Sequence, residues 1–438
     1  MANPVVVPRS EHSLSRKQID PDALRVLHRL HQHHYIACLV GGSVRDLLLG
    51  LRPKDFDIGT SAHPYQVKRL FRNCWIIGRR FRLAHVRFGT KAVEVATFRR
   101  KLSAEEIAAE NAPIAERALP VDESDPPGHS RLVHRDNSFG TPEEDAFRRD
   151  FTVNALFYDI ATLSVIDFTG GLEDLRAKVM RCIGDPNERF QEDPVRMLRA
   201  VSMAARLDFS IDPPIDEAIE KHRTEIAKAA PARLLEELYK LLRAGAGERA
   251  FRMLAERRLL EPIASQLQAR SGDALWRSLG ALDSYRRRFD ATPETLTNAI
   301  LLGSLIVPLG LGFGGTPPPL RRDSDERRRE PALALGMLPL PRRDVDRLTQ
   351  ILGLQRRLID ANMSPRARRA LTHRGPFQDA LTWLDIHGNA PEVLEHWRGF
   401  LEAAATFEPD AEPGEPARPR RRRRRRHRRP PTATPHGS

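Results

Sequence analysis

The sequence is poor in cysteine and contains no long apolar segment. Its three cysteines, Cys38, Cys74 and Cys182, are odd in number and none pairs with another at metal-site spacing. This argues against a disulfide framework or a structural zinc site and favours a reducing cytoplasmic location. The most apolar run, 299–313, is interrupted by Pro308 and by glycines and is too short to span a bilayer. The first twenty residues lack the apolar core of a signal peptide.

Positive charge is concentrated in one segment near the end of the sequence. The formal net charge is +13, and residues 418–429 contain ten arginines and no acid. Without them the chain has 61 basic and 58 acidic residues, so the remainder is close to neutral. A run of like charges repels itself and buries no apolar surface, which predicts a disordered tail. Its expected partner is a polyanion, RNA ahead of DNA or an anionic membrane, and the alternative is a solubilising tail.

Hydrophobic periodicity divides the chain into a mixed first part and a helical remainder. Strand-like segments at 35–40, 54–59, 74–78, 83–88, 92–98 and 153–159 alternate with helix-like segments at 20–32, 44–50, 63–71 and 143–151. Later patterns are helical, at 193–208, 214–229, 231–243 and 246–259, and continue to about 405. We therefore predict an α+β fold with a small mixed sheet followed by an all-α part. The polar, aperiodic segment 101–140 predicts a mobile or functional loop.

Asp55 and Asp57 provide the first chemical signal. On a strand, two residues separated by one other point to the same face. Carboxylates held side by side repel each other, and a site usually keeps them so because a cation lies between them; hard oxygen ligands suit Mg²⁺ or Mn²⁺. Alone, this pattern is more often a pair of exposed acids at a strand end.

A glycine turn lies upstream of the two aspartates. Gly41, Gly42 and Ser43 separate a predicted strand from a predicted helix. Glycines let backbone N–H groups approach a phosphate, the N-terminus of a helix favours negative charge, and Arg45 can pair with the same phosphates. The turn lacks the spacing of a dinucleotide-binding loop or a P-loop, so alone it is no more specific than a helix cap.

Glu94 is a third acid, within a strand-like segment of valines and alanines. Its same-face neighbours Ala92 and Ala96 leave room around the carboxylate. Such an acid is commonly exposed at a sheet edge, but the other two signals favour a functional role. Three carboxylates can hold two metal ions about 4 Å apart, an arrangement that suits phosphoryl or nucleotidyl transfer. In such chemistry one ion activates an attacking hydroxyl, and the other neutralises the triphosphate and the leaving pyrophosphate.

Three of these segments resemble a known family. LVGGSVRDLLLG (39–50), PKDFDIG (53–59) and VEVATFR (93–99) resemble the nucleotidyltransferase head of the polymerase-beta superfamily. More narrowly, they resemble its class II branch, the bacterial poly(A) polymerases and CCA-adding tRNA nucleotidyltransferases. The resemblance is strong over 36–245 and weaker to about 405. It implies that Asp55, Asp57 and Glu94 are catalytic acids that bind two Mg²⁺ ions, or Mn²⁺ in their place.

The segment RRDFTVNAL (148–156) resembles the family motif for ribose and triphosphate contacts. Arg148 and Arg149 can bind phosphate, and Asp150 can accept a hydrogen bond from a sugar hydroxyl. The resemblance to the poly(A) branch also counts Asp150 among the catalytic acids. The alternative is a charge cluster at a helix end. DFTGGLEDL (167–175) resembles the following hinge motif.

The segment EDPVRMLRA (192–200) resembles the family's template for the incoming base. An Asp acceptor beside an Arg fork can read adenine, with Asp193 accepting from N6 and Arg196 donating to N1. The alternative is an ordinary helix start, with Asp193 as N-cap and Pro194 after it. Ser202 stands where relatives commonly carry arginine, which puts a triphosphate contact from that position in doubt. The predicted nucleotide-binding residues are Gly41, Gly42, Ser43, Arg45, Arg148, Arg149, Asn154, Glu192, Asp193, Arg196 and Arg199.

Several segments favour the poly(A) branch over the CCA-adding branch. IIGRRFRLAHV (76–86) resembles the segment that marks poly(A) polymerases, and 135–151, 231–245 and the arginine-rich tail are also similar to that branch. No His-Asp dipeptide occurs, which disfavours the phosphohydrolase domain of some CCA-adding relatives. We interpret His85, within the first of these segments, as structural or as an RNA contact.

The resemblance implies template-independent polyadenylation of RNA 3′ ends in the cytoplasm. AMP would be transferred from ATP with release of pyrophosphate, the product RNA would be marked for decay, and an RNA chaperone or the degradation machinery would be a partner. The alternatives are a CCA-adding enzyme and a non-catalytic RNA-binding protein. The expected regions are a flexible arm (1–20), a nucleotidyltransferase head (21–168), a helical neck for nucleotide recognition and RNA binding (169–255), a helical body (256–407) and a disordered arginine-rich tail (408–438).

Overall fold

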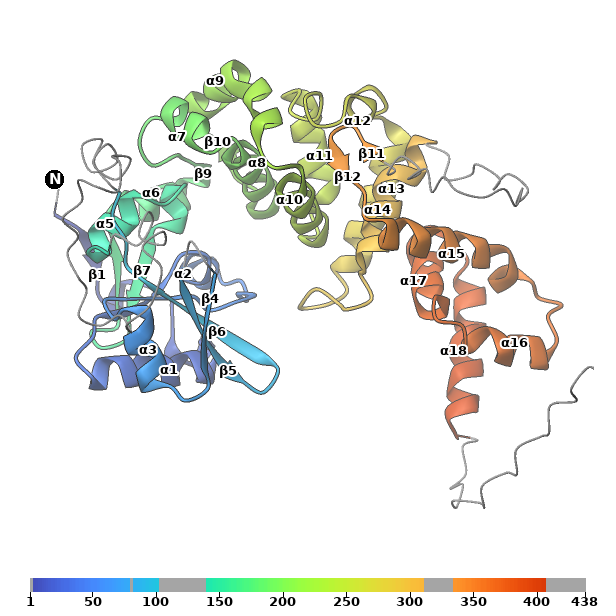
Figure 1. Cartoon of the computed structure of the whole chain (residues 1–438), viewed down its shortest axis with the longest axis horizontal. Helices are drawn as coiled ribbons and strands as arrows, with labels where there is room; N and C mark the ends of the chain where they lie inside the picture. Colours follow the sequence, from blue (N-terminus) through green and yellow to red (C-terminus); the bar gives the residue numbers. More distant parts are fainter. Residues whose placement is uncertain (1–2, 79–81, 102–138, 311–333, 407–438) are drawn as a thin grey trace, which may run out of the picture. The chain divides into compact units, whose positions relative to one another are not determined.

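The computed structural model describes residues 3–78, 82–101, 139–310 and 334–406 (Figure 1). Most of the predicted loop 101–140 and the whole of the predicted tail 408–438 lie outside these residues. Contacts separate the chain into one unit from Met1 to Asn389 and a second from Ala390 onward. In the second unit the described residues form one helix, α18 (Pro391–Thr406). The first unit begins with a sheet and continues as helices, which confirms the predicted α+β class.

An eight-stranded mixed sheet forms the first part of the chain. Its strand order is β1-β8-β7-β2-β3-β6-β5-β4. Among the described strands of this sheet, β3 and β6 are the only parallel pair, and all other neighbours are antiparallel. The bounds in chain order are β1 (Val5–Val7), β2 (Ala37–Val40), β3 (Ile58–Thr60), β4 (Cys74–Ile77), β5 (Leu83–Phe88), β6 (Lys91–Thr97), β7 (Leu156–Asp159) and β8 (Ser164–Asp167).

Two predictions about this sheet were wrong in detail. Residues 1–20 do not form only a flexible arm, because Val5–Val7 pairs antiparallel with β8 and becomes an edge strand. The strand predicted at 54–59 begins only at Ile58. Asp55 and Asp57 therefore lie in the segment that leads into β3. The hydrogen bonds between β2 and this segment extend only as far as Asp57, whose carbonyl accepts from the N–H of Val40 at 3.0 Å.

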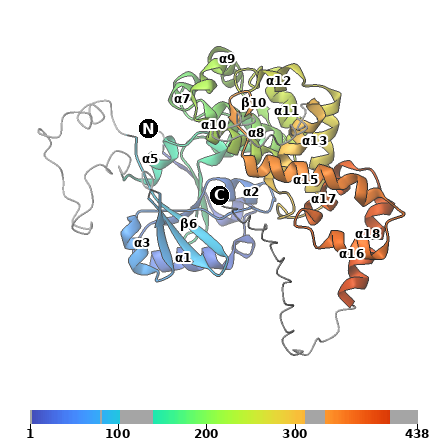
Figure 2. The ribbon, with the colours of Figure 1, turned by 45° about the vertical axis from the view of Figure 1, so that its right-hand side comes forward.

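Two helices cover one face of the sheet, and this determines where Glu94 points. The helices α1 (Pro21–Gln32) and α3 (Pro64–Leu70) both contact β6, and Figures 1 and 2 show them on the same side of it. Val93 and Val95 are buried on β6, whereas Glu94 between them is partly exposed. Because alternate strand residues face opposite sides, Glu94 lies on the face that α1 and α3 leave uncovered.

The segment predicted as a hinge forms a tightly bonded turn between β8 and α6 (Gly171–Ala177). The carboxylate of Asp167 accepts hydrogen bonds from four successive backbone N–H groups, at 2.8–3.1 Å. Gly171 is needed for close packing, because a Cβ atom there would lie 2.2 Å from the carbonyl oxygen of Thr152. Thr152 also donates a hydrogen bond to Asp174 on α6, at 2.7 Å. This turn fixes α6 against the 3₁₀ helix η5 (Thr152–Asn154).

The next helices lie in the range predicted as the neck (169–255). They are α7 (Pro186–Glu192), α8 (Val195–Leu207), α9 (Pro213–His222), the 3₁₀ helix η6 (Arg223–Lys228), α10 (Pro231–Arg243) and α11 (Gly247–Glu256). A short parallel pair, β9 (Val179–Met180) with β10 (Ser210–Ile211), lies beside α8. The helix predicted at 193–208 begins at Val195, because Asp193 has an extended backbone and ends α7.

In the range predicted as the body (256–407), the regular structure of the described residues is helical apart from one small hairpin, β11 (Ala334–Leu335) and β12 (Leu338–Pro339). Its helices are α12 (Ser265–Ala269), α13 (Asp273–Arg286), α14 (Asn298–Ile306), α15 (Arg342–Ile359), α16 (Pro365–Thr372) and α17 (Phe377–His387). The apolar sequence of α14 is explained by burial: Gly303 packs so closely that a Cβ atom would lie 2.5 Å from Trp383 and 2.6 Å from Leu348. In the described residues, no helix is long and apolar enough to span a bilayer.

Candidate nucleotide site

The parallel pairing of β3 with β6 brings two of the predicted acids together. Ile58 pairs with Val95, so Asp57 and Glu94, each one residue earlier, lie side by side where β3 begins. Neighbouring atoms partly desolvate the Asp57 carboxylate, although the residue keeps an exposed surface. This desolvation, together with the charges of Glu94 and Asp55, raises the pKa of Asp57 to about 6. The three acids therefore act on one another electrostatically.

Asp55 is an exposed acid. Its side chain is 71% exposed, and Nζ of Lys54 lies 3.7 Å from its Oδ2. Among the described residues, no three His, Cys, Asp or Glu side chains are grouped closely enough to hold a metal ion. The donor chemistry nevertheless fits a hard divalent cation, because such an ion would relieve the repulsion that raises the pKa of Asp57.

His85 lies opposite Glu94 in the antiparallel pair of β5 with β6. Its Nε2 atom is 3.6 Å from Oε2 of Glu94, which is an ion-pair distance when the imidazole is protonated. The sequence interpretation of His85 as structural is compatible with this contact. The contact also places His85 on the same open face as the acids.

The glycine turn brings the backbone close to two arginines. Gly41 has a φ of +71°, and a Cβ atom there would lie 2.9 Å from the guanidinium of Arg149. At Gly42, a Cβ atom would lie 3.3 Å from the guanidinium of Arg45. Ser43 is buried, and its hydroxyl donates to the carbonyl of Val40 at 3.1 Å. The predicted phosphate turn therefore has arginine groups at both of its glycines.

Arg45 is a buried arginine on α2 (Gly42–Leu48). Its Nε donates to Asp46 at 2.8 Å, and another of its nitrogens lies 2.7 Å from the same Asp46 oxygen. Its third nitrogen donates to the side-chain oxygen of Asn154. Burial lowers the pKa of Arg45 below its usual value, while Asp46 opposes this shift. The predicted residues Arg45 and Asn154 are thus in direct contact.

Arg148 and Arg149 follow α5 (Pro142–Phe147) and share one buried partner, Asp145. Arg149 bonds Asp145 through two nitrogens at 2.9 and 3.2 Å, and Arg148 does so at 3.2 Å. Arg149 also donates to the carbonyl of Asn154 at 3.2 Å, and its guanidinium lies 5.4 Å from the ring centre of Phe157. These contacts hold Arg149 beside the glycine turn.

Asp150 lies at the junction of the head with α8. One carboxylate oxygen accepts from the backbone N–H of Phe151 at 2.9 Å and from the amide of Asn154 at 3.3 Å. The other lies 2.6 Å from a guanidinium nitrogen of Arg199, as an ion pair without the alignment of a hydrogen bond. Asp150 is buried, whereas Arg199 is partly exposed. The structure therefore joins the predicted residues Asp150, Asn154 and Arg199.

The side chains of Asp193 and Arg196, the predicted base-reading pair, bond other partners and not each other, although the backbone N–H of Arg196 donates to the carbonyl of Asp193 at 3.1 Å. Arg233 of α10 donates to both Asp193 oxygens, at 3.0 and 2.6 Å. Arg196 donates to Glu192 at 3.0 Å and to the carbonyl of Arg189 at 2.9 Å. Although partial burial acts to raise the pKa of Glu192, hydrogen bonds from Lys101 and Arg196 lower it to about 2. Asp193 ends α7 and Arg196 belongs to α8, so the one-helix geometry expected from the sequence was wrong.

Several charged residues that support this region were not predicted from the sequence. They are Asp46, Asp145, Arg189, Arg206 and Arg233. Arg189 of α7 is buried and donates to the carbonyls of Arg148 and Arg149. The adjacency of Asp46 to Arg45 was the one signal in the sequence. The other partners are distant in the chain or have no distinguishing pattern.

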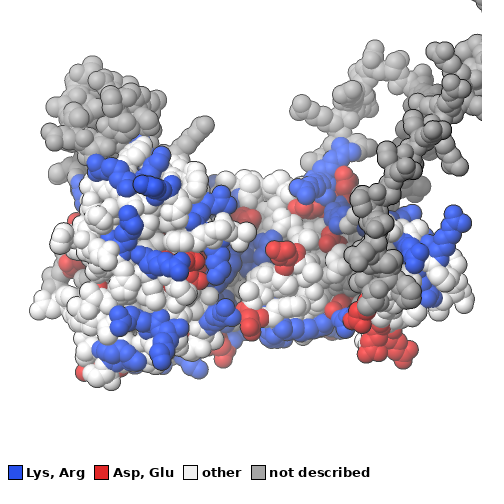
Figure 3. Space-filling view, turned by 90° about the horizontal axis from the view of Figure 1, so that it is seen from below, with Lys and Arg blue, Asp and Glu red and all other residues white. Residues whose placement is uncertain are grey.

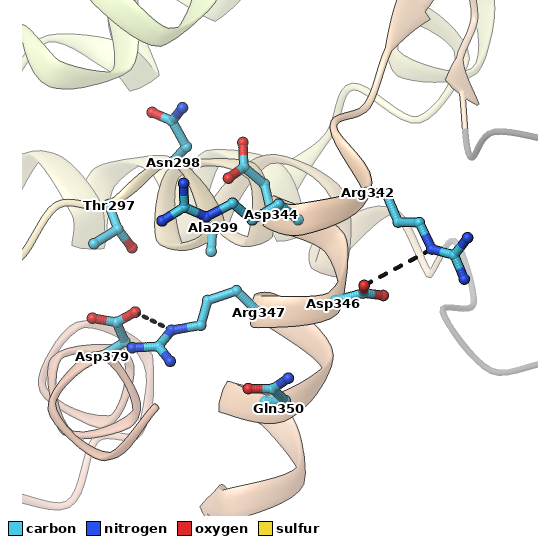
Figure 4. Close-up of a pocket in the computed structure, with 10 residues that line it drawn as sticks. Thr297, Asn298, Ala299, Arg342, Asp344, Asp346, Arg347, Gln350 and Asp379 are labelled. Atoms are coloured by element: carbon cyan, nitrogen blue, oxygen red, sulfur yellow. Dashed lines mark hydrogen bonds and ion pairs between the residues drawn. The ribbon is translucent and has the colours of Figure 1, made fainter. Parts of the chain in front are cut away.

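A separate cavity of about 850 Å³ lies in the body and contains none of the predicted site residues. Figure 4 shows it between the start of α14, the first turns of α15 and Asp379 of α17. Its lining combines three arginines and three aspartates with neutral residues, and Arg347 donates to Asp379 at 2.7 Å. The charges balance, so the cavity offers no clear preference for an anion or a cation.

Three family models match consecutive parts of the chain. Residues 37–181 match the poly A polymerase head domain, 208–270 match a probable RNA and SrmB-binding site of polymerase A, and 334–430 match the polymerase A arginine-rich C-terminus. Together these matches cover well over half of the sequence and include both the glycine turn and the three acids. The chain belongs to the poly(A) polymerase family.

Relatives in this family carry two different names. The chain is 48% identical over 258 residues to poly(A) polymerase I of Escherichia coli O6:H1, covering 59% of this chain and 53% of the relative. It is 33% identical over 241 residues to the CCA-adding enzyme of Lactobacillus helveticus, covering 55% and 54%. The chain thus spans about half the length of the curated relatives it matches.

A solved structure extends the likeness beyond the head. The crystal structure of the Bacillus stearothermophilus CCA-adding enzyme in complex with CTP is 28% identical, with a TM-score of 0.58. The match covers 88% of this chain and 83% of that one. The sheet and the helices after it therefore share the family fold.

Proposed function

We propose that this chain is a template-independent RNA adenylyltransferase, which transfers AMP from ATP to the 3′-hydroxyl of RNA and releases pyrophosphate. The observation that supports this proposal most directly is that Asp57 lies next to Glu94, beside a glycine turn flanked by Arg45 and Arg149. The 48% identity to poly(A) polymerase I supports polyadenylation over other nucleotidyl transfers.

In this proposal Asp55, Asp57 and Glu94 hold two Mg²⁺ ions, or Mn²⁺. When bound, the metal supplies activation of the attacking hydroxyl and neutralisation of the leaving pyrophosphate. The carboxylates fit this task because a bound cation would offset the repulsion that Glu94 and Asp55 exert on Asp57. Asp150 contributes as a fourth acid, and it orients Arg199 and Asn154 next to the sugar and phosphates.

The triphosphate is bound by the glycine turn and the arginines around it. Gly42 and Ser43 present backbone N–H groups, and Gly41, whose own N–H donates to the carbonyl of Leu156, forms the turn before them. Arg45 and Arg149 add fixed positive charge at the same place. Arg148 is more exposed than Arg149 and extends this positive surface. Preorganised charge of this kind accelerates transfer because it needs no rearrangement as charge develops on the phosphates.

Adenine is selected by Asp193 and Arg196 through their polar atoms. In the structure both side chains already have partners, Arg233 for Asp193 and Glu192 for Arg196. Base binding therefore requires each side chain to share or exchange these bonds. Glu192 belongs to the site in this sense, because it sets the position of Arg196.

RNA binds through basic surface on the helical part and through the arginine-rich tail. The face in Figure 3 carries many lysine and arginine side chains with fewer acidic ones among them. On α16 and just after it, Arg366, Arg369 and Arg374 are exposed, and within the described part of the chain none of them forms an ion pair. Such groups give sequence-independent, salt-sensitive RNA affinity.

The same proposal extends to cellular role. A cytoplasmic enzyme that adds adenylate to RNA 3′ ends would act in mRNA processing and mark transcripts for decay. Its partners would be an RNA chaperone or components of the degradation machinery, which bind the same RNA. Association with these partners is supported by the match of residues 208–270 to a probable RNA and SrmB-binding site.

The second candidate is a CCA-adding enzyme, favoured by the structural likeness to the Bacillus stearothermophilus enzyme. One experiment separates the candidates: the protein is incubated with Mg²⁺, a generic RNA or a tRNA that lacks its CCA end, and each of the four nucleoside triphosphates in turn. Repeated addition of AMP to generic RNA supports polyadenylation. Addition of CMP to the tRNA supports the alternative, and no addition of any nucleotide supports a non-catalytic RNA-binding protein.

A further inference from the structure

Asp46 is a buried carboxylate that contacts two arginines from distant parts of the chain. It is 5% exposed and lies on α2, directly after Arg45. Arg206 of α8, 160 residues away, reaches the same carboxylate with three hydrogen bonds of 3.1–3.3 Å. A buried charge is tolerated when it is paired and hydrogen-bonded, and Asp46 meets this condition through both arginines.

Asp46 and Asn154 together determine the orientation of the Arg45 guanidinium. Asp46 bonds one edge of the planar group, and Asn154 accepts from the remaining nitrogen. The group therefore lies against Gly42 at the start of α2. Without Asp46, the guanidinium would lose its charged partner on that edge and would be free to turn away from the glycine turn.

Arg206 is one of three residues by which α8 contacts this region. Arg199, Met203 and Arg206 are spaced four and three residues apart, so they share one helix face. Arg199 pairs with Asp150, and the sulfur of Met203 accepts a hydrogen bond from Asn154 at 3.4 Å. The face of α8 is thus bonded at each of its three residues to the groups that surround Arg45.

The charges in this cluster do not cancel. Asp46 is shared by two guanidinium groups, so one positive charge is left over beside the glycine turn. Asp150 is the next carboxylate, and it is already paired with Arg199. A surplus positive charge held rigidly at the start of a helix fits a polyphosphate, because charge and backbone N–H groups then act at the same place.

We propose that Asp46 is a positioning residue for the triphosphate, which holds Arg45 against the glycine turn, and that Arg206 couples the docking of α8 to this orientation. The proposal rests on the proposed function only in that the site binds a nucleoside triphosphate. It does not depend on which base is added.

The test is R206Q, with R206K as the conservative variant and R249Q as the matched control. Arg249 forms an exposed ion pair with Asp208, so R249Q removes an arginine pair without touching Arg45. We measure KM and kcat for ATP and for CTP in RNA extension, the Kd of Mg-ATP without RNA, the Kd of RNA without ATP, and the melting temperature. Loss of a charge-assisted bond should raise the KM and the Kd of Mg-ATP about tenfold, leaving kcat within about threefold.

The same factor is expected for ATP and CTP, with RNA affinity unchanged and with partial recovery in R206K. D46N should raise the KM and the Kd of Mg-ATP by a larger factor. If D46N does not fold, the result for R206Q alone decides the proposal. Unchanged Mg-ATP affinity in folded R206Q, or an equal change in R249Q, would overturn the proposal. Exclusive use of CTP by the wild type would instead contradict polyadenylation and leave the positioning role standing.

Discussion

Arg233 holds Asp193 by two hydrogen bonds, to Oδ1 at 3.0 Å and to Oδ2 at 2.6 Å. The carboxylate proposed to read adenine is therefore held by Arg233 of α10, together with the backbone N–H of Val195 at 3.2 Å, and not by the side chain of Arg196. Arg233 is about half exposed, so this pair is accessible to solvent and to an incoming base. The relationship makes α10 part of base recognition in the proposed reaction.

Base selection should depend on both residues of this pair. In D193A, the preference for ATP over GTP in RNA extension should fall by about tenfold or more, because one polar contact to the base edge is lost. In R233Q, the carboxylate of Asp193 remains but loses its charged partner, so we expect a smaller loss of preference. Extension assays with each nucleotide at equal concentration measure both effects. A full ATP preference in D193A would show that the base is read elsewhere.

Neutralising Asp57 should separate activity from stability. In D57N, extension should fall by about a thousandfold or more, because a proposed metal ligand is lost. In buffer with a chelator, the variant should be as stable as wild type or more stable by up to about 1 kcal/mol, because repulsion from Glu94 and Asp55 disappears. Chemical denaturation gives the second value. A folded D57N that still extends RNA would remove Asp57 from the mechanism.

His387 should make the stability of the chain depend on pH. Burial lowers the pKa of His387 to about 4, and its Nε2 lies 2.9 Å from the hydroxyl of Ser304. In the unfolded chain, His387 has its usual pKa of 6.5. Between pH 6.5 and pH 4, the unfolded state therefore binds a proton at His387 that the folded state does not bind. The free energy of unfolding should therefore fall by about 2–3 kcal/mol as the pH drops from 6.5 to 4.

The variant H387Q should lose most of this pH dependence, while H373Q, which changes an exposed histidine, should keep it. Urea unfolding at pH 7.5 and at pH 5 measures the difference for each variant. The same slope in H387Q as in the wild type would mean that other groups cause the acid sensitivity.

Removal of the exposed arginines on α16 and just after it should weaken RNA binding and make the remaining affinity less sensitive to salt. In R366Q/R369Q/R374Q, the slope of log K against log salt should decrease by about 2, because each phosphate contact to a single strand contributes about 0.7. Deletion of 417–438 should flatten the slope further and leave ATP binding intact. Filter binding or fluorescence anisotropy at several salt concentrations measures both.

A matched control for this series is R25Q/R252Q/R258Q. These arginines are also partly or largely exposed, but each is paired with a nearby acid, Asp22, Glu248 and Glu261 respectively. The control changes the net charge by the same amount as the α16 variant. An equal loss of RNA affinity in the two triple variants would attribute the effect to overall charge and not to the α16 surface.

Local sequence patterns predicted most of the helices and strands, because the spacing of apolar residues indicates which face of a helix or strand is buried. The alternation of Val93 and Val95 with Glu94 identified β6, and the apolar spacing of 20–32 identified α1. The prediction that a strand includes Asp55 was wrong because the strand depends on hydrogen bonds to its partner β2. These bonds begin only at the carbonyl of Asp57. β1 was missed for the same reason, since its partner β8 lies about 160 residues later in the chain.

The candidate residues were predicted individually, but their partners were not. Family motifs identified Arg45, Asp150 and Asp193, whereas the fold forms the ion pairs. Asp46 with Arg206, Asp150 with Arg199 and Asp193 with Arg233 join segments 40 to 160 residues apart. With 71 basic and 58 acidic residues in the sequence, no rule of spacing singles out these pairs. Only the fold decides which charges become neighbours.

The parallel alignment of β3 with β6 also limits how the sequence between them can change. An insertion in the connections between β3, α3, β4, β5 and β6 can be absorbed, because Ile58 and Val95 stay opposite each other. Loss of one residue of β6 after Glu94, such as Val95, would instead move Glu94 into the register position of Val95. Its carboxylate would then turn toward α1 and α3, since a one-residue slip reverses the side chains of a strand. Length variation among functional homologues should therefore be confined to the loops, with the few residues on either side of Glu94 invariant in number.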